Sequence, residues 1–172
     1  QELSYGQIAE LAAQASPFAV YIDPDHNEFY STNDMPAEIN KYLAETGQGQ
    51  IDDKGQMIRV ILESLAFKYR LVLERMEKVT ASRIDVLHVV GGGIKNELLC
   101  QFTANATGKK VITGPAEATA MGNIIMQAIA TGQIESVSQG RDIVRNTIEL
   151  KEYMPLDSKL WAKEYNNARK FF

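Results

Sequence analysis

Three consecutive glycines and the amide residue that follows them carry the clearest chemical signal: Gly91, Gly92, Gly93 and Asn96. The aliphatic run 86–90 ends at the glycines and an amphipathic segment begins after them, which predicts a strand, a tight turn and a helix. Without Cβ atoms the turn lets a ligand approach the backbone, and the start of a helix presents unpaired N–H groups. Phosphate groups and flat bases suit such a place. The pattern therefore predicts nucleotide binding.

The glycine turn departs from two common nucleotide-binding patterns. No Lys-Ser/Thr pair follows the glycines as in Walker A, and the G-x-G-x-x-G spacing of dinucleotide folds is missing. A purely structural turn is an alternative, although one glycine would suffice for a turn and there are three. Asn96 could hydrogen-bond a base or sugar edge from one turn into the helix, or it could pair with backbone donors there. Lys95 could meet a phosphate, but it is typical of a solvated surface charge.

A second candidate segment, residues 114–123, follows the next predicted strand. Glu117 falls in the first turn of a predicted helix, where the helix dipole favours a carboxylate. The same helix has small residues that predict close packing against a neighbouring backbone: Ala118, Ala120 and Gly122. A tightly packed helix and a ligand contact through Thr119 or Asn123 remain alternatives.

The other reactive residues favour structural roles. Glu63 lies among apolar residues of a long predicted helix, where we expect a capped or salt-bridged carboxylate. His26 and His88 have no further ligand at metal spacing, so no metal site is assigned. Cys100 is expected to pack in the core. The acidic loop 23–25 could bind Mg²⁺ or a sugar hydroxyl, but its composition favours a turn.

Composition narrows the class of protein. The chain has 172 residues, 45% of them hydrophobic, enough for one domain or a large piece of a bigger protein. A net charge of −4 without a basic run argues against nucleic acid as a partner. The single cysteine excludes an internal disulfide and fits a reducing cytoplasm. No apolar run approaches the ~18 residues of a membrane span, so no membrane partner is expected.

Hydrophobic periodicity organises the chain into helices and a few strands. Helices are predicted over 5–14, 34–47, 54–78, 94–106, 117–130, 138–145 and 158–172, and strands over 84–90 and 109–113. This alternation favours a layered α/β fold with neighbouring parallel strands. The first half has few strand signals and the chain begins at Gln1, so we expect a fragment whose sheet partners lie elsewhere. Its last helix is expected to expose aromatic residues to an interface or a missing part: Trp161, Tyr165, Phe171 and Phe172.

Two segments resemble a known family. Residues 87–99 resemble the adenine-site segment of the FGGY carbohydrate kinases, and residues 112–124 follow at the family's spacing. Most sugar kinases of this group have Glu-Ala-x-Ala-x-Gly-Ala in the second segment. Here Asn123 follows Gly122 and the segment opens with Gly114-Pro115, which resembles the rhamnulokinase branch.

The resemblance implies a ribonuclease H-like, actin-like ATPase fold of class α/β, with two lobes that close on sugar and ATP. Residues 1–172 would be the C-terminal, nucleotide-binding lobe, with the N-terminal lobe and the start of this lobe absent. Gly92 would lie against the ADP phosphates, Gly91 and Gly93 would shape the turn, and Asn96 would lie at the adenine. The catalytic Asp and most sugar contacts would lie outside this chain, so no catalytic residue is assigned within it.

The implied activity is phosphorylation of L-rhamnulose by ATP to L-rhamnulose 1-phosphate in rhamnose catabolism, with Mg²⁺. The isolated chain is predicted to be inactive and to bind nucleotide weakly, because half of the cleft is missing. Two alternatives stay open: an FGGY kinase for another ketose or polyol, and a nucleotide-binding module without chemistry. A dinucleotide-binding fold fits less well, since the acidic residue about 20 positions after the glycines, Glu117, opens a helix rather than ending a strand.

Overall fold

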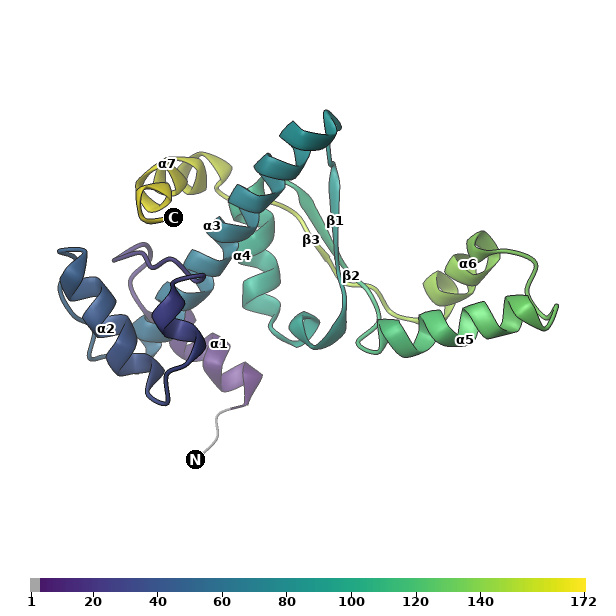
Figure 1. Ribbon diagram of the computed structural model, residues 1–172, viewed down its shortest axis with the longest axis horizontal. Helices are drawn as coiled ribbons and strands as arrows, with labels where there is room; N and C mark the ends of the chain where they lie inside the picture. Colours follow the sequence, from purple (N-terminus) through teal and green to yellow (C-terminus); the bar gives the residue numbers. More distant parts are fainter. Residues whose placement is uncertain (1–3) are drawn as a thin grey trace.

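A computed structural model describes residues 4–172 of the chain (Figure 1). The helices are α1 (Tyr5–Gln14), α2 (Met35–Glu45), α3 (Lys54–Thr80), α4 (Glu97–Thr107), α5 (Ala118–Ala130), α6 (Val137–Thr147) and α7 (Ser158–Ala168). Short 3-10 helices occupy Asn27–Tyr30, Gly91–Lys95 and Arg169–Phe171. The strands are β1 (Val86–Val89), β2 (Lys110–Thr113) and β3 (Glu152–Tyr153). The predicted helices and both predicted strands are present.

Side-chain caps explain why the helices begin where the sequence predicts. Ser4 and Gln7 form a capping box, in which the Gln7 N–H donates to Ser4 Oγ and the Ser4 N–H donates to Gln7 Oε1. Asp34 and Asp53 accept hydrogen bonds from backbone amides in the first turns of α2 and α3. Gly108 ends α4 in a left-handed conformation, with φ +66°.

The sheet has the order β1-β2-β3 within the described residues. β1 and β2 are parallel, with Val86 opposite Lys110 and Val89 opposite Thr113, which confirms the predicted parallel pair. β3 pairs with β2 in the antiparallel direction. The sequence did not predict β3, because two residues are too few for an alternating pattern to be recognised.

The largest core cluster lies between α3, α4 and α7. The Trp161 and Tyr165 side chains of α7 are buried there, and the Trp161 ring centroid lies 5.3 Å from that of Phe67. The expectation that the last helix exposes its aromatic residues was therefore wrong for these two. Phe171 and Phe172 are half-buried against the same cluster. Helix α7 therefore packs against this chain itself, with its aromatic face on the apolar faces of α3 and α4.

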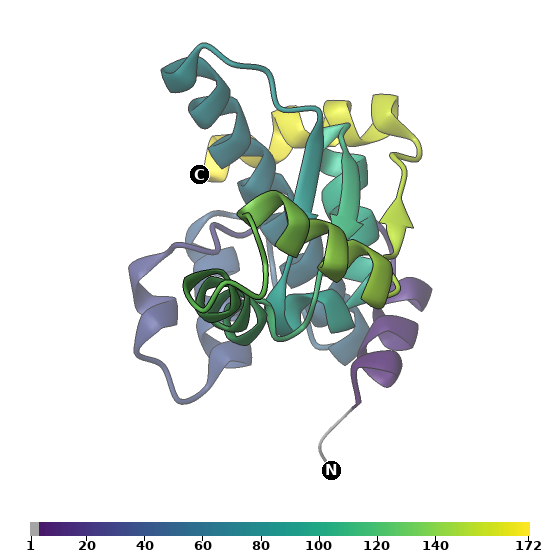
Figure 2. The same cartoon turned by 90° about the vertical axis from the view of Figure 1, so that its right-hand side faces the viewer.

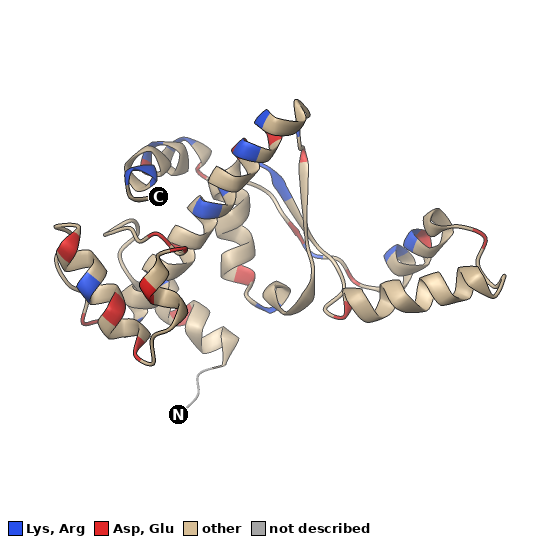
Figure 3. Cartoon of the chain, in the orientation of Figure 1, with Lys and Arg blue, Asp and Glu red and all other residues tan. Residues whose placement is uncertain are grey.

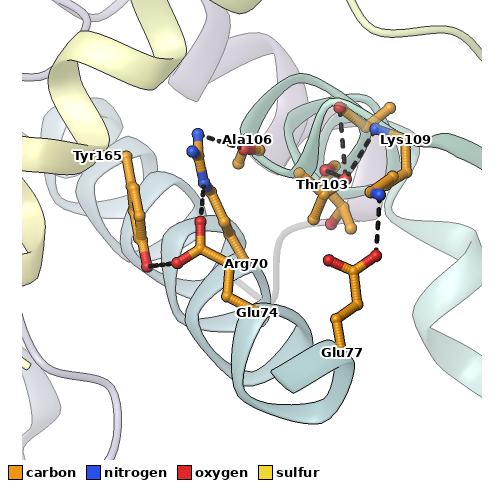
Figure 4. A network of polar contacts seen from close by, with 9 residues as sticks. Arg70, Glu74, Glu77, Thr103, Ala106, Lys109 and Tyr165 are labelled. Carbon is orange, nitrogen blue, oxygen red and sulfur yellow. Dashed lines mark hydrogen bonds and ion pairs between the residues drawn. The ribbon is translucent and has the colours of Figure 1, made fainter. Parts of the chain in front are cut away.

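A polar network fastens α3 to α4 and α7 (Figure 4). The Tyr165 hydroxyl donates to Glu74 Oε2 at 2.8 Å, and Arg70 Nε donates to Glu74 Oε1 at 2.8 Å. Arg70 also donates to the carbonyl of Ala106 at 3.1 Å. Burial, followed by the bond to Glu74, raises the pKa of Tyr165 to about 12. One arginine thus links the middle of α3 to the end of α4 and, through a carboxylate, to α7.

Helices α5 and α6 form a hairpin that extends away from the rest of the chain (Figure 1). No residue of α5 is buried, and its apolar residues Ile124 and Met126 are exposed. A Cβ added at Gly122 would meet nothing within 4 Å, so the expected close packing of the small residues was wrong within the described chain. The close approach occurs at Gly140 of α6, against Ile125. Within residues 4–172, no helix has both the length and the apolar character needed to cross a membrane.

Candidate functional site

The glycines lie where β1 ends, beside the end of β2. They form the 3-10 helix Gly91–Lys95 rather than the tight turn expected from the sequence. The Gly91 N–H donates to the Pro115 carbonyl at 3.1 Å, and the Gly114 N–H donates to the Val89 carbonyl at 2.7 Å. These two bonds bring together the two segments that the sequence singled out, at the carboxyl ends of neighbouring parallel strands. In open α/β sheets, ligands bind at that edge.

The backbone explains one glycine of the three. Gly91 has φ +78°, a conformation that a side chain would strain. At Gly92 an added Cβ would meet nothing within 4 Å, and at Gly93 the nearest atom is a Val89 methyl at 4.0 Å. Neither of these two has a positive φ. The fold of this chain therefore requires glycine only at Gly91, and the bare backbone at the other two is open to an approaching molecule.

Asn96 is the N-cap of α4, so its predicted place one turn into the helix was wrong. Its Oδ1 accepts a hydrogen bond from the Leu99 N–H at 3.0 Å. The structural alternative for Asn96, in which its side chain accepts a hydrogen bond from a backbone N–H, is therefore the one observed. Because an amide group also carries two N–H donors, engagement of Oδ1 still leaves Nδ2 able to donate to a ligand. Lys95 is exposed beside it.

A cleft of about 600 Å³ opens next to the glycine segment, between the ends of β1 and β2 and helix α6. Viewed from the hairpin, α6 crosses in front of the two parallel strands (Figure 2). His88 and Thr113 line the strand side, and Arg141 and Arg145 line the helix side. Figure 3 shows blue positions, which mark Lys and Arg, along α6. Arg145 also forms an ion pair with Asp142 at 2.9 Å, so part of its charge is balanced.

Sequence reasoning missed both arginines of the cleft. Their spacing of four residues on a predicted helix was a usable signal, because it places two cations on one helix face. What the sequence could not supply was the position of that face over the strand ends. Three other residues, in or just before α5, were proposed from the sequence as ligand contacts. They are exposed and do not line the cleft: Glu117, Thr119 and Asn123.

Glu63 has the structural role that the sequence favours. Its carboxylate is fully buried, accepts from Arg59 Nε at 2.7 Å and accepts from the Phe18 N–H at 2.9 Å. Burial raises the pKa of Glu63, and the bonds from Phe18 and Arg59 oppose that shift. Cys100 is buried as expected, and burial raises the pKa of its thiol. His88 stands exposed on β1.

The acidic loop is a turn neutralised by a lysine. The Asp25 N–H donates to Asp23 Oδ1 at 3.0 Å, which closes the turn. Lys68 Nζ lies 2.6 Å from Asp23 and 3.0 Å from Asp25. The carboxylates are thus already paired. Across residues 4–172, no three His, Cys, Asp or Glu side chains are grouped so that they could hold a metal ion.

Comparison with known proteins identifies the family. A family model described as the C-terminal domain of the FGGY family of carbohydrate kinases matches residues 1–131. The chain belongs to the FGGY family. The family match ends just after α5, so α6, β3 and α7 lie beyond it. The Arg141 and Arg145 wall of the cleft and the core aromatics of α7 therefore fall outside the matched segment.

Individual relatives match nearly the whole chain. A rhamnulokinase from Bacteroides thetaiotaomicron is 42% identical over 164 residues, covering 95% of this chain and 34% of that protein. A rhamnulokinase from Bacillus subtilis is 35% identical over 156 residues, covering 91% of this chain and 32% of that protein. The chain spans about a third of the length of the curated relatives it matches.

Solved structures show the same fold at low sequence identity. Plasmodium falciparum glycerol kinase, solved with ADP, superposes with a TM-score of 0.67 at 16% identity, covering 96% of this chain and 33% of that one. Rhodospirillum rubrum xylulose kinase gives a TM-score of 0.62 at 14% identity, covering 96% of this chain and 32% of that one. These likenesses confirm the expected fold class, the C-terminal lobe of the ribonuclease H-like, actin-like ATPase fold.

Proposed function

We propose that the protein containing this chain phosphorylates L-rhamnulose at its 1-hydroxyl, with ATP as the phosphoryl donor, and that this chain forms part of the ATP/ADP site. Family membership supports a carbohydrate kinase, and the rhamnulokinases similar to the chain support this sugar. One structural observation supports the nucleotide site most directly. Gly92 and Gly93 leave bare backbone at the end of a parallel strand, although the chain's own packing does not require glycine there.

In this proposal the glycine segment holds the nucleotide. Gly92 lies against the phosphates, with Gly91 and Gly93 shaping the backbone around them. Asn96 donates from Nδ2 toward the adenine while its Oδ1 caps α4. Arg141 lines the adjoining cleft and contributes positive charge beside the phosphates. Phosphoryl transfer depends mainly on positioning and on neutralising charge, and these residues supply part of both.

Mg²⁺ enters this proposal with ATP, and its protein ligands lie outside this chain. The acidic loop does not fit the ion, because Lys68 already pairs with both Asp23 and Asp25. The Mg²⁺ would neutralise phosphate charge. No carboxylate of this chain is assigned as the base for the sugar hydroxyl.

We propose that residues 1–172 are the C-terminal, nucleotide-binding lobe, and that an N-terminal lobe of the same protein carries the catalytic Asp and most sugar contacts. The coverage of about a third of each relative supports this division. The chain alone is then expected to show no kinase activity. It would bind nucleotide weakly, because the opposing half of the cleft is absent.

The test is ADP release by the full-length protein with MgATP, across L-rhamnulose, L-fuculose, L-ribulose, D-xylulose and glycerol. We expect selective turnover of L-rhamnulose. Gly92→Val should raise the KM for ATP by at least about tenfold, because a branched side chain would occupy the space given to phosphates. Gly6→Val is the matched control, since Gly6 is also an exposed glycine without a positive φ.

The alternative outcomes separate the alternative functions. Selective turnover of another sugar would contradict L-rhamnulose as substrate and support a different FGGY kinase. No turnover of any sugar, with ADP binding retained, would support a nucleotide-binding module without chemistry. An unchanged KM for ATP in Gly92→Val would contradict the role of the glycine segment.

A further inference from the structure

Residues 150–156 form a strap that returns from helix α6 to the sheet and passes the end of β2. The Thr113 N–H donates to the Lys151 carbonyl at 2.9 Å, and the Lys151 N–H donates back to Thr113 Oγ1 at 3.0 Å. Farther along, the Leu156 N–H donates to Asn105 Oδ1 of α4 at 2.8 Å. The strap is therefore fixed both to β2 and to α4. It lies beyond the segment that the family model matches.

The side chain of Lys151 joins the strap to the start of α4. Its Nζ forms an ion pair with Glu97 Oε1. Glu97 is the first residue of α4 and directly follows the N-cap Asn96. The bond to Glu97 raises the pKa of Lys151, so the ammonium group stays charged near neutral pH. Thr113, which holds the lysine backbone, is buried and also lines the cleft beside the glycine segment.

Glu97 is an unfavourable neighbour for phosphate groups. It is the one acidic residue in the sequence between positions 86 and 116, the stretch that contains β1, the glycine segment and β2. A carboxylate in the first turn of a helix interacts with the positive end of the helix dipole, which an anionic ligand would otherwise use. It also repels phosphates, and this repulsion grows with the number of charges on the nucleotide. A cation paired with Glu97 cancels both effects.

We propose that Lys151 is a positioning residue of the nucleotide site, which acts by neutralising Glu97 and holding its carboxylate on the strap. This inference rests on the proposed function, because it requires phosphates at the glycine segment. The role differs from that of Arg141, which lines the cleft and adds positive charge directly. Lys151 acts through Glu97, so its removal should matter only while Glu97 carries a charge.

Titration calorimetry of the full-length protein with adenosine, ADP and ATP tests this role, at low salt and without Mg²⁺ so that the phosphates keep their charge. In Lys151→Met, the Kd for ADP should rise about fivefold and that for ATP by more, because Glu97 is left unpaired. The Kd for adenosine, which has no phosphate, should stay within about twofold. Adding Glu97→Gln to Lys151→Met should restore the Kd for ADP to within about twofold of the original.

Lys110→Met is the matched control. Lys110 also pairs with a carboxylate of the strap, Glu152 at 2.7 Å, but it lies at the start of β2, at the opposite end of the strand from Thr113. This substitution should change the Kd for ADP by less than about twofold.

The outcomes separate this inference from the proposed function. Equal weakening of adenosine and ADP by Lys151→Met, or no recovery with Glu97→Gln, would overturn the charge-based role. An unchanged Kd for ADP in Lys151→Met, with binding still weakened by Gly92→Val, would overturn this inference and leave the glycine site standing. Failure of the unaltered protein to bind ADP would overturn the proposed function and this inference with it.

Discussion

Removal of the buried Glu63 carboxylate is expected to destabilise the chain more than any change to its surface ion pairs. Glu63 is fully buried, and its partner Arg59 is 13% exposed. Arg59 also donates to the carbonyls of Ala12 and Ala15 at the end of α1, at 3.0 and 3.2 Å. The pair thus joins α1 and α3, and Glu63 additionally accepts from the amide of Phe18, which has φ +55°. Glu63→Ala breaks all of these links except those from Arg59 to α1.

The magnitude follows from what each partner loses. Breaking one side of a buried ion pair costs about 3–5 kcal/mol, because the other charge remains buried without its counter-ion. Arg59 keeps two carbonyl acceptors and a little solvent, which places the expected loss near the lower limit, about 3 kcal/mol. Glu63→Gln also removes the counter-charge of Arg59, but it keeps an acceptor for the Phe18 amide and the side-chain volume, so it should cost less, about 2 kcal/mol. In a chain of this length, about 3 kcal/mol corresponds to a fall in Tm of about 6–12 °C.

Urea unfolding at pH 7, followed by far-ultraviolet circular dichroism, measures these changes as a shift in midpoint at constant slope. Asp142→Ala is the control, because it removes an exposed ion pair with Arg145 and should change stability by less than about 1 kcal/mol. The reasoning is refuted if Glu63→Ala and Asp142→Ala destabilise equally. It is also refuted if Glu63→Gln costs no more than Asp142→Ala, because glutamine likewise leaves Arg59 buried without a counter-ion.

Three further predictions concern the packing of α3 and α5. The fold raises the pKa of Tyr165 from 10.0 to about 12. The protonated hydroxyl therefore stabilises the folded chain fully below pH 10, and this contribution is lost as pH rises toward 12. In urea titrations, Tyr165→Phe should therefore lower the free energy of unfolding by about 1–2 kcal/mol at pH 8, because the bond to Glu74 is lost, and by progressively less above pH 10. A loss that does not depend on pH would contradict this. Gly55→Ala should destabilise by about 1–3 kcal/mol by the same assay, because the new Cβ would lie 2.6 Å from the Leu11 carbonyl oxygen. Gly122→Ala meets no such atom and should stabilise α5 by about 0.5–1 kcal/mol, and a loss there would show that α5 is packed after all.

Much of the local structure was predictable because its causes are local. The capping box of Ser4, the N-cap Asp53 and the left-handed Gly108 set helix boundaries through contacts a few residues apart. Periodic apolar residues predicted α3 almost to its ends, and the parallel pairing of β1 with β2 followed from the intervening helix. The glycine segment stood out for the same reason, since adjacent residue types alone mark where a backbone is left bare.

Other features depended on contacts between distant segments. Periodicity shows that a helix has an apolar face but not what covers it, which is why Trp161 proved buried while the apolar residues of α5 proved open. Asn96 could have contacted a ligand or its own helix, and only the geometry at the start of α4 assigned its oxygen to a cap. Arg141 became part of a site only when α6 folded across the strand ends. The sequence by itself determined the elements and the family motif, whereas the tertiary structure decided which surfaces meet, because hydrophobic burial favours contact without specifying the partner.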